Sequence, residues 1–186
     1  KEKRTGQIWR IGDTYNVSIG QGDLLLTPLQ LINFIASIAN GGKIYRPHLV
    51  SAPPSLAPTL SVGEPTPGVG FVGRQFPVLF DYSDWQEELA AVRRGMEDAV
   101  SKPYGTANML AYLPMKSAGK TGSSQVANNT RTNAFFVGYA PATDPEIAIL
   151  VLIENSKEGS LNAVPVARDV MQWYYENRIS NGKSKL

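Results

Sequence analysis

The stretch Lys120-Thr121-Gly122-Ser123 decides the fold, because it places a cation, two hydroxyl groups and a bare backbone on a single β-strand. The strand pattern continues to residue 126, a polar turn follows at residues 128–130, and an extended pattern resumes at residues 133–137. We therefore predict that these four residues lie in the first arm of a β-hairpin.

Each of these residue types has a physical role in a site for acyl transfer. Gly122 lacks a Cβ atom, so a substrate can lie against its backbone as an added strand. Strand alternation places Thr121 and Ser123 on one face, where both hydroxyl groups can donate to a substrate carboxylate. Lys120 supplies a charge that attracts the carboxylate or helps to move a proton. The Ser123 amide is a candidate oxyanion-hole donor, a role worth about 3–4 kcal/mol per donor.

The tripeptide Lys120-Thr121-Gly122 is also compatible with a purely structural role. Lysine, threonine and glycine are common residues, and K-T-G alone is a weak motif. The same residues would occur in an exposed edge strand whose lysine prevents it from pairing with strands of other molecules. Other parts of the chain must decide between the two interpretations.

Several longer segments decide it, because the chain resembles the transpeptidase domain of the penicillin-binding proteins, whose third active-site motif is K-T-G. The resemblance is to class B members, most of all to the elongation type, and it runs from Trp9 to the C-terminal helix. The matching segments follow the family's order: Trp9 and residues 12–14, 18–22, 27–30, 105–107, 118–122 and 136–141.

The resemblance implies a role for each residue of the Lys120–Ser123 stretch. Lys120 would interact with the active-site serine motifs, and Thr121 and Ser123 would bind the carboxylate of a D-alanyl-D-alanine stem peptide or of a β-lactam. Gly122 would lie against the substrate, and the Ser123 amide would complete the oxyanion hole. The family usually carries threonine where Ser123 stands, and serine keeps both the hydroxyl and the amide. No metal and no organic cofactor is required.

The family's other two active-site motifs, S-x-x-K and S-x-N, precede K-T-G, and only decoys for them occur in this chain. Their literal matches are the pairs Ser117/Lys120, Ser180/Lys183 and Ser160/Asn162. In the first pair, a strand spacing of three puts the side chains on opposite faces, about 10 Å apart. The second pair lies in a polar tail, and the third lies after K-T-G in a predicted loop.

The missing motifs imply that residues 1–186 are the C-terminal portion of one transpeptidase domain, without its nucleophile. We expect Lys1 not to be the natural N-terminus. The expected partners are peptidoglycan stem peptides and β-lactams, the missing N-terminal part of the same protein, and the membrane-bound machinery of cell-wall synthesis. The expected location is the extracytoplasmic, periplasmic face of the bacterial inner membrane, with the anchor in a segment outside this chain.

Composition excludes several other classes of function. A net charge of +2 is too small to predict nucleic-acid binding, and the absence of cysteine excludes disulfides and thiolate chemistry. The only histidine, His48, lies between Pro47 and Leu49 and is expected to pack, which leaves no histidine-rich metal site. The longest apolar run, residues 147–153, has the length of a strand and not of a membrane span.

Two helices and a long loop are predicted before the strands. Thr27, Pro28 and Gln30 form the start signal of a helix that ends at residues 40–42. It is apolar around most of its circumference, so we expect it to be buried on several sides. Residues 51–73 are rich in proline, glycine and serine, which predicts a surface loop. A second helix is expected over residues 83–100, with Ser83 and Gln86 as its capping box. Its apolar stripe consists of Leu89, Val92, Met96 and Val100.

Residues 115–178 form a predicted block of strand, hairpin, strand and helix. The three strands cover residues 115–126, 133–139 and 146–154, and the closing helix covers residues 163–177. The third strand is apolar throughout, which indicates cover on both faces. We expect the closing helix to cover one of those faces with the side chains of Val166, Val170, Trp173 and Tyr174.

The expected fold class is α+β, with an antiparallel sheet of three strands packed against helices. A sheet of three strands with an apolar strand at its outer edge is small and exposed to aggregation. The resemblance implies the penicillin-binding, serine transpeptidase fold, in which strands from the missing part complete the sheet.

Two alternatives remain beside a peptidoglycan D,D-transpeptidase. A β-lactam-sensing or β-lactamase relative shares the K-T-G strand, although the class B pattern at residues 20–30 disfavours it. A non-catalytic module that docks onto cell-wall machinery is the alternative from a different class. An S-x-x-K motif on the parent polypeptide would distinguish the enzyme from the module.

Overall fold

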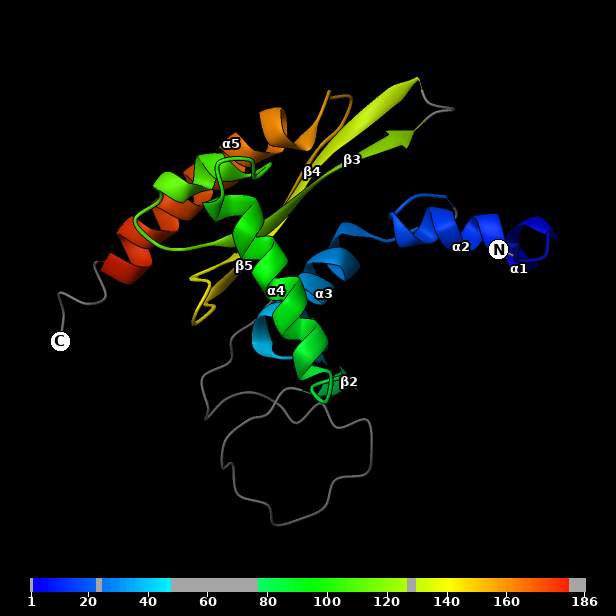
Figure 1. The fold of residues 1–186 in the computed structure, drawn as a ribbon, viewed down its shortest axis with the longest axis horizontal. Coiled ribbons are helices and arrows are strands. Elements are labelled where there is room, and N and C mark those ends of the chain that lie inside the picture. Colours follow the sequence, from blue (N-terminus) through cyan, green and yellow to red (C-terminus); the bar gives the residue numbers. More distant parts are fainter. Residues whose placement is uncertain (1, 23–24, 48–76, 127–129, 181–186) are drawn as a thin grey trace, which may run out of the picture.

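A three-stranded antiparallel sheet is the centre of the computed structural model, which describes residues 2–22, 25–47, 77–126 and 130–180 (Figure 1). Its strands are β3 (Ala118–Val126), β4 (Arg131–Ala140) and β5 (Ile147–Ile153), in the order β3-β4-β5. The predicted hairpin and third strand are therefore confirmed. Among the described residues, β5 pairs only with β4, so its outer edge has no partner strand.

The pairing of β3 with β4 determines which side chains share a face. Thr121 lies opposite Phe136 and Ser123 lies opposite Ala134, whereas Lys120 lies opposite Val137. Because paired residues project to the same side of a sheet, Thr121 and Ser123 share one face and Lys120 occupies the other. The predicted common face of the two hydroxyl side chains is confirmed.

The face with Phe136 and Ala134 is covered by helix α5 (Gly159–Tyr174), through small and flexible side chains. The predicted contact stripe was wrong, because Val166 and Trp173 remain 45% and 55% exposed. The side chains that pack on the sheet are those of Ala163, Val164, Ala167 and Met171. The helix also begins four residues before the predicted Ala163, at Gly159, which places Ser160 in a helix and not in a loop. A π-helical turn, η2 (Tyr175–Ser180), follows it.

The other face of the sheet is covered by helix α3 (Pro28–Asn40) and helix α4 (Gln86–Ser101). The predicted start of α3 is confirmed, because the Thr27 side chain accepts from the Gln30 amide and the Gln30 side chain accepts from the Thr27 amide. Its C-cap, Gly41, has a left-handed φ of 95°, as a helix-ending glycine requires. Burial on several sides holds for the second half of α3, where Ile35, Ser37, Ile38 and Ala39 are buried, but not for its start, where Leu29 is 59% exposed.

Helix α4 begins at Gln86, three residues later than predicted, and the expected capping box of Ser83 and Gln86 does not form. The Gln86 carboxamide donates instead to the backbone carbonyl of Ser83, which holds a turn before the helix. The predicted apolar stripe packs through Leu89, Met96 and Val100, but Val92 lies on the exposed side. The chain then turns into a short 3₁₀ helix, η1 (Asn108–Tyr112).

Four further elements were not predicted. Helices α1 (Glu2–Thr5) and α2 (Ile11–Ser18) form an arm that extends away from the sheet (Figure 1), and α2 has no buried residue. Strands β1 (Lys43–Tyr45) and β2 (Val78–Asp81) form a separate two-stranded sheet. The predicted loop at residues 51–73 and His48 lie outside the described residues. Within the described ranges, no helix has the length and hydrophobicity needed to cross a membrane.

Candidate functional site

The candidate site is the open edge of β3, the edge that does not face β4. Two interactions show which backbone groups point there: the Lys120 ammonium donates to the Thr121 carbonyl at 2.6 Å, and the Gln21 carboxamide donates to the Ser123 carbonyl at 3.4 Å. In an antiparallel strand, the N–H and C=O of one residue point toward the same edge, and the direction alternates along the chain. The amides of Thr121 and Ser123 therefore also face the open edge, where a ligand strand can pair with them.

Lys120 is solvent-exposed and lies on the opposite face of β3 from the two hydroxyl side chains. Its ammonium group reaches around the open edge to the Thr121 carbonyl. A ligand at this edge would therefore lie between a positive charge on one face and two hydroxyl groups on the other.

Both hydroxyl groups have protein partners that sequence reasoning missed. The Thr121 hydroxyl donates to the Thr106 hydroxyl at 2.7 Å, and the Ser123 hydroxyl accepts from the backbone N–H of Gly159 at 3.4 Å. Thr106 lies just before η1 and Gly159 begins α5, so elements from two other parts of the chain meet at this strand. In the sequence, residues 105–107 are only one of the segments that resemble the family, and nothing marks Gly159.

The glycine that packing demands at this site is Gly159 and not Gly122. A Cβ atom on Gly122 would meet the Phe135 Cβ atom at 3.5 Å, which is ordinary contact. A Cβ atom on Gly159 would lie 2.3 Å from the Phe135 carbonyl oxygen and 2.7 Å from that of Gly122. The backbone of α5 therefore rests directly on the K-T-G strand, at its own first residue.

Two of the decoy motifs, Ser117/Lys120 and Ser160/Asn162, lie at the starts of β3 and α5. Ser117 is buried beside the start of β3, and its hydroxyl has no partner among the described residues. The Ser160 hydroxyl donates to the Glu158 carboxylate, and the Asn162 side chain accepts from the Glu158 amide, so both side chains bind the residue that caps α5. Within the described residues, no group of three or more His, Cys, Asp or Glu side chains could hold a metal ion.

Comparison with known proteins points in one direction. The sequence model of the penicillin binding protein transpeptidase domain matches residues 1–172. Peptidoglycan D,D-transpeptidase MrdA of Haemophilus influenzae is 33% identical in an alignment of 196 positions, which covers 96% of this chain and 28% of the relative. The chain therefore spans less than a third of that relative.

Solved structures agree in fold as well as in sequence. Pseudomonas aeruginosa PBP2, in complex with WCK 5153, superposes with a TM-score of 0.75 at 34% identity, over 96% of this chain and 37% of that one. Helicobacter pylori PBP2, in complex with MreC, gives a TM-score of 0.71 at 29% identity, over 96% of this chain and 30% of that one. The predicted fold class, α+β with an antiparallel sheet packed against helices, is confirmed. The chain belongs to the family of penicillin-binding protein transpeptidase domains.

Proposed function

We propose that this chain is the C-terminal part of a peptidoglycan D,D-transpeptidase, which transfers an acyl group from D-alanyl-D-alanine stem peptides and is acylated by β-lactams. The observation that carries the proposal is the open edge of β3, where the backbone groups of Thr121 and Ser123 face outward beside Lys120. The names of the relatives support the same activity, since MrdA of H. influenzae is a peptidoglycan D,D-transpeptidase. The activity belongs to the full-length protein, and we expect the chain alone to be inactive.

In this mechanism, a serine outside the chain attacks the carbonyl carbon between the two D-alanines. A bond forms between the serine oxygen and that carbon, D-alanine leaves, and the amine of a second stem peptide then takes the acyl group. The amide of Ser123 donates to the oxygen that becomes negative, a role worth about 3–4 kcal/mol in comparable sites. Lys120 supplies positive charge beside the reacting serine and assists proton movement.

Substrate binding follows from the same edge. The stem peptide lies along β3 as an added strand, with Gly122 against its backbone. Its terminal carboxylate binds the hydroxyl groups of Thr121 and Ser123, which share one face of the strand. The carboxylate of a β-lactam occupies the same position.

The remainder of the polypeptide is the first partner of this chain. Among the described residues, the outer edge of β5 has no partner strand, and α5 carries a row of exposed apolar side chains: Val166, Val170 and Trp173. An apolar surface of this kind is typical of a surface that another segment covers. We propose that the missing part of the domain pairs with β5 and packs on this row.

The parent protein is further proposed to work in membrane-bound cell-wall machinery, at the periplasmic face of the bacterial inner membrane. One solved relative is a complex of PBP2 with MreC, and another belongs to a peptidoglycan synthase complex. The membrane anchor would lie in a segment outside this chain.

Intact-mass measurement after incubation with benzylpenicillin tests the proposal, on the full-length protein and on this chain alone, with peptide mapping of any adduct. A stable adduct on the parent only, at a serine N-terminal to Lys1, is the expected result. An adduct that forms and hydrolyses rapidly would favour a β-lactamase relative. No adduct on either protein would favour a non-catalytic docking module.

A further inference from the structure

The hydroxyl groups of Thr121 and Thr106 form a pair at the face of β3 where the proposed carboxylate site lies. Thr121 Oγ1 donates to Thr106 Oγ1 at 2.7 Å, although the residues are 15 positions apart in the sequence. Thr106 is exposed and Thr121 is half-buried, so the pair lies at the boundary between protein and solvent. Such a pair can be a chance surface contact, or it can be held in place by its surroundings.

The backbone around Thr106 is fixed by contact with α4. A Cβ atom on Gly105 would lie 2.2 Å from the Ala99 carbonyl oxygen, so the turn touches the helix backbone without a side chain between them. On the other side of Thr106, the Ala107 amide donates to the same Ala99 carbonyl at 2.9 Å, and Ala107 is fully buried. Thr106 is therefore held between two anchored neighbours.

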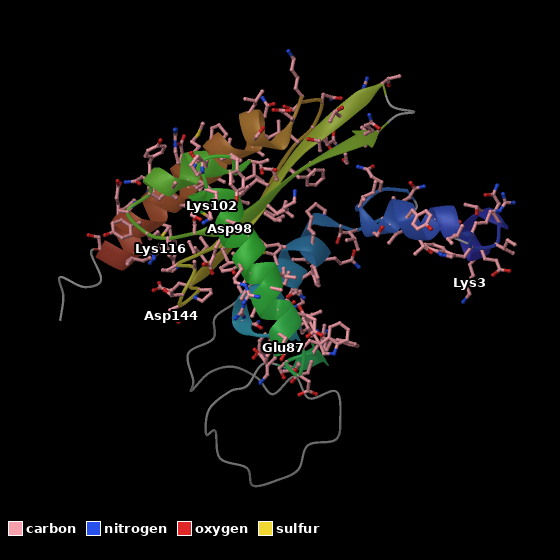
Figure 2. All side chains as sticks on the ribbon, in the orientation of Figure 1. Lys3, Glu87, Asp98, Lys102, Lys116 and Asp144 are labelled. Carbon is pink, nitrogen blue, oxygen red and sulfur yellow. The ribbon has the colours of Figure 1, made fainter. Side chains whose placement is uncertain are left out.

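Polar contacts secure the same turn against the end of α4. The Asn108 carboxamide donates to the carbonyl groups of Val100, at 3.2 Å, and Lys102, at 2.9 Å. Asp98 and Lys102 lie next to each other on the last turn of the helix (Figure 2), with 3.9 Å between their charged atoms. The contact between the two threonines is thus part of a built arrangement and not of a mobile loop.

We propose that Thr106 is a positioning residue, which sets the hydroxyl of Thr121 for a ligand carboxylate. The inference rests on the proposed function. A hydroxyl group has one proton to donate, and in this structure the Thr121 hydroxyl donates to the Thr106 hydroxyl. A carboxylate accepts hydrogen bonds only, so Thr121 must turn its proton to the ligand when one binds. Thr106 then donates to Thr121 Oγ1 in return, and each proton stays on its own oxygen.

This reversal gives the pair a preference for anionic ligands. In the bound state, the Thr106 hydroxyl donates to Thr121, and Thr121 donates to the carboxylate. Successive hydrogen bonds of this kind polarise one another, and a bond to a charged acceptor is stronger than a bond to a neutral one. Loss of the Thr106 hydroxyl should therefore weaken the binding of a carboxylate more than the binding of its neutral ester.

The test uses the full-length protein, with benzylpenicillin and its methyl ester as probes and the second-order acylation rate as the readout. Thr106→Val removes the hydroxyl and keeps the shape, and Thr106→Ser keeps the hydroxyl. We expect Thr106→Val to lower the rate with benzylpenicillin about tenfold and the rate with the ester less than about twofold. Thr106→Ser should stay within about twofold of the wild type for both probes.

Two further variants complete the design. Thr106→Val combined with Thr121→Val should acylate no more slowly than Thr121→Val alone, because Thr106 acts through Thr121. Thr143→Val is the matched control, since Thr143 is an exposed threonine in the turn between β4 and β5. It should change neither rate.

The ratio of the two rates decides the outcome, because each variant provides its own reference even if it is less stable. An equal loss with both probes, or no rescue by Thr106→Ser, would overturn the positioning role and leave the proposed function intact. A wild-type protein that neither probe acylates would overturn the proposed function and this inference together.

Discussion

The backbone N–H of Gly159 lies 3.4 Å from the hydroxyl oxygen of Ser123, so the first residue of α5 is bound to the strand that carries K-T-G. The helix that covers one face of the sheet thus begins at the candidate site. The Phe135 carbonyl of β4 also lies close to Gly159, 2.3 Å from the place of an added Cβ atom, which makes this junction of three elements sensitive to any added atom.

A methyl group on Gly159 should therefore damage both stability and activity. In Gly159→Ala, the new Cβ atom would lie 2.3 Å from the Phe135 carbonyl oxygen, and backbone must move to admit it. We expect a loss of about 1–3 kcal/mol in the free energy of unfolding of the full-length protein, measured by denaturant titration, with slower acylation.

The control for this substitution is Gly95→Ala, in the middle of α4. Gly95 is exposed, and a Cβ atom there would meet nothing within 4 Å. Alanine should stabilise the helix by about 0.5–1 kcal/mol. If both variants behave alike, the close approach of Gly159 does not govern stability.

Lys120 should be required for acylation, whereas a neighbouring lysine should not be. Lys120→Ala removes the charge beside the open edge of β3, and we expect the benzylpenicillin acylation rate to fall about a hundredfold or more. Lys116→Ala is the matched control, because Lys116 is also exposed and lies just before the same strand (Figure 2). Equal rates for the two variants would exclude a catalytic role for Lys120.

The role proposed for the Ser123 amide can be separated from that of its hydroxyl. Ser123→Pro removes the N–H group at a position where it faces the open edge, which an edge strand tolerates. The acylation rate should fall about 10²–10³-fold, whereas Ser123→Thr should keep it within about twofold.

Gln125→Pro provides the comparison, because Gln125 has the same backbone orientation two residues along β3. It should leave acylation nearly unchanged. A comparable loss in Gln125→Pro would mean that proline disturbs the strand as a whole, and the oxyanion role of Ser123 would lose its support.

Tyr139, which is buried, and Tyr82, which is half-buried, should respond in opposite ways to loss of the hydroxyl group. The Tyr139 hydroxyl is buried, has no partner among the described residues, and burial raises the pKa of this phenol. Tyr139→Phe should leave the free energy of unfolding unchanged or raise it by up to about 1 kcal/mol. Tyr82→Phe should lower it by about 1 kcal/mol, because the Tyr82 hydroxyl bonds the Ser37 hydroxyl. Denaturant titration of both variants distinguishes the two cases.

The sequence correctly predicted those elements of the fold that depend on interactions between nearby residues. Thr27, Pro28 and Gln30 determine the start of α3 through contacts within four residues, and the apolar run of β5 identifies a strand covered on both sides. The orientation of α5 was missed because Val166 and Ala167 are neighbours on the helix. The packed row of Ala163, Ala167 and Met171 has the same four-residue spacing as Val166 and Val170, so spacing alone does not choose between the two rows.

In the candidate site too, only the features that depend on nearby residues could be predicted. The residues of β3 and their common face followed from strand alternation, so Thr121 and Ser123 were predicted together. Their partners Thr106 and Gly159 come from distant positions, and tertiary packing alone brings them to the strand. Contacts between residues that are far apart in the chain leave no periodic pattern in its sequence.

The lack of space at Gly105 and Gly159 also limits how this site can evolve. Neither glycine is among the residues proposed to bind the ligand, yet a Cβ atom on either would lie close to a carbonyl oxygen, at 2.2 Å and 2.3 Å respectively. A single substitution at either glycine therefore cannot move Thr121 or Ser123 by a small amount. Substitutions that adjust the proposed carboxylate site would therefore have to act from its solvent side, where Thr106 is exposed.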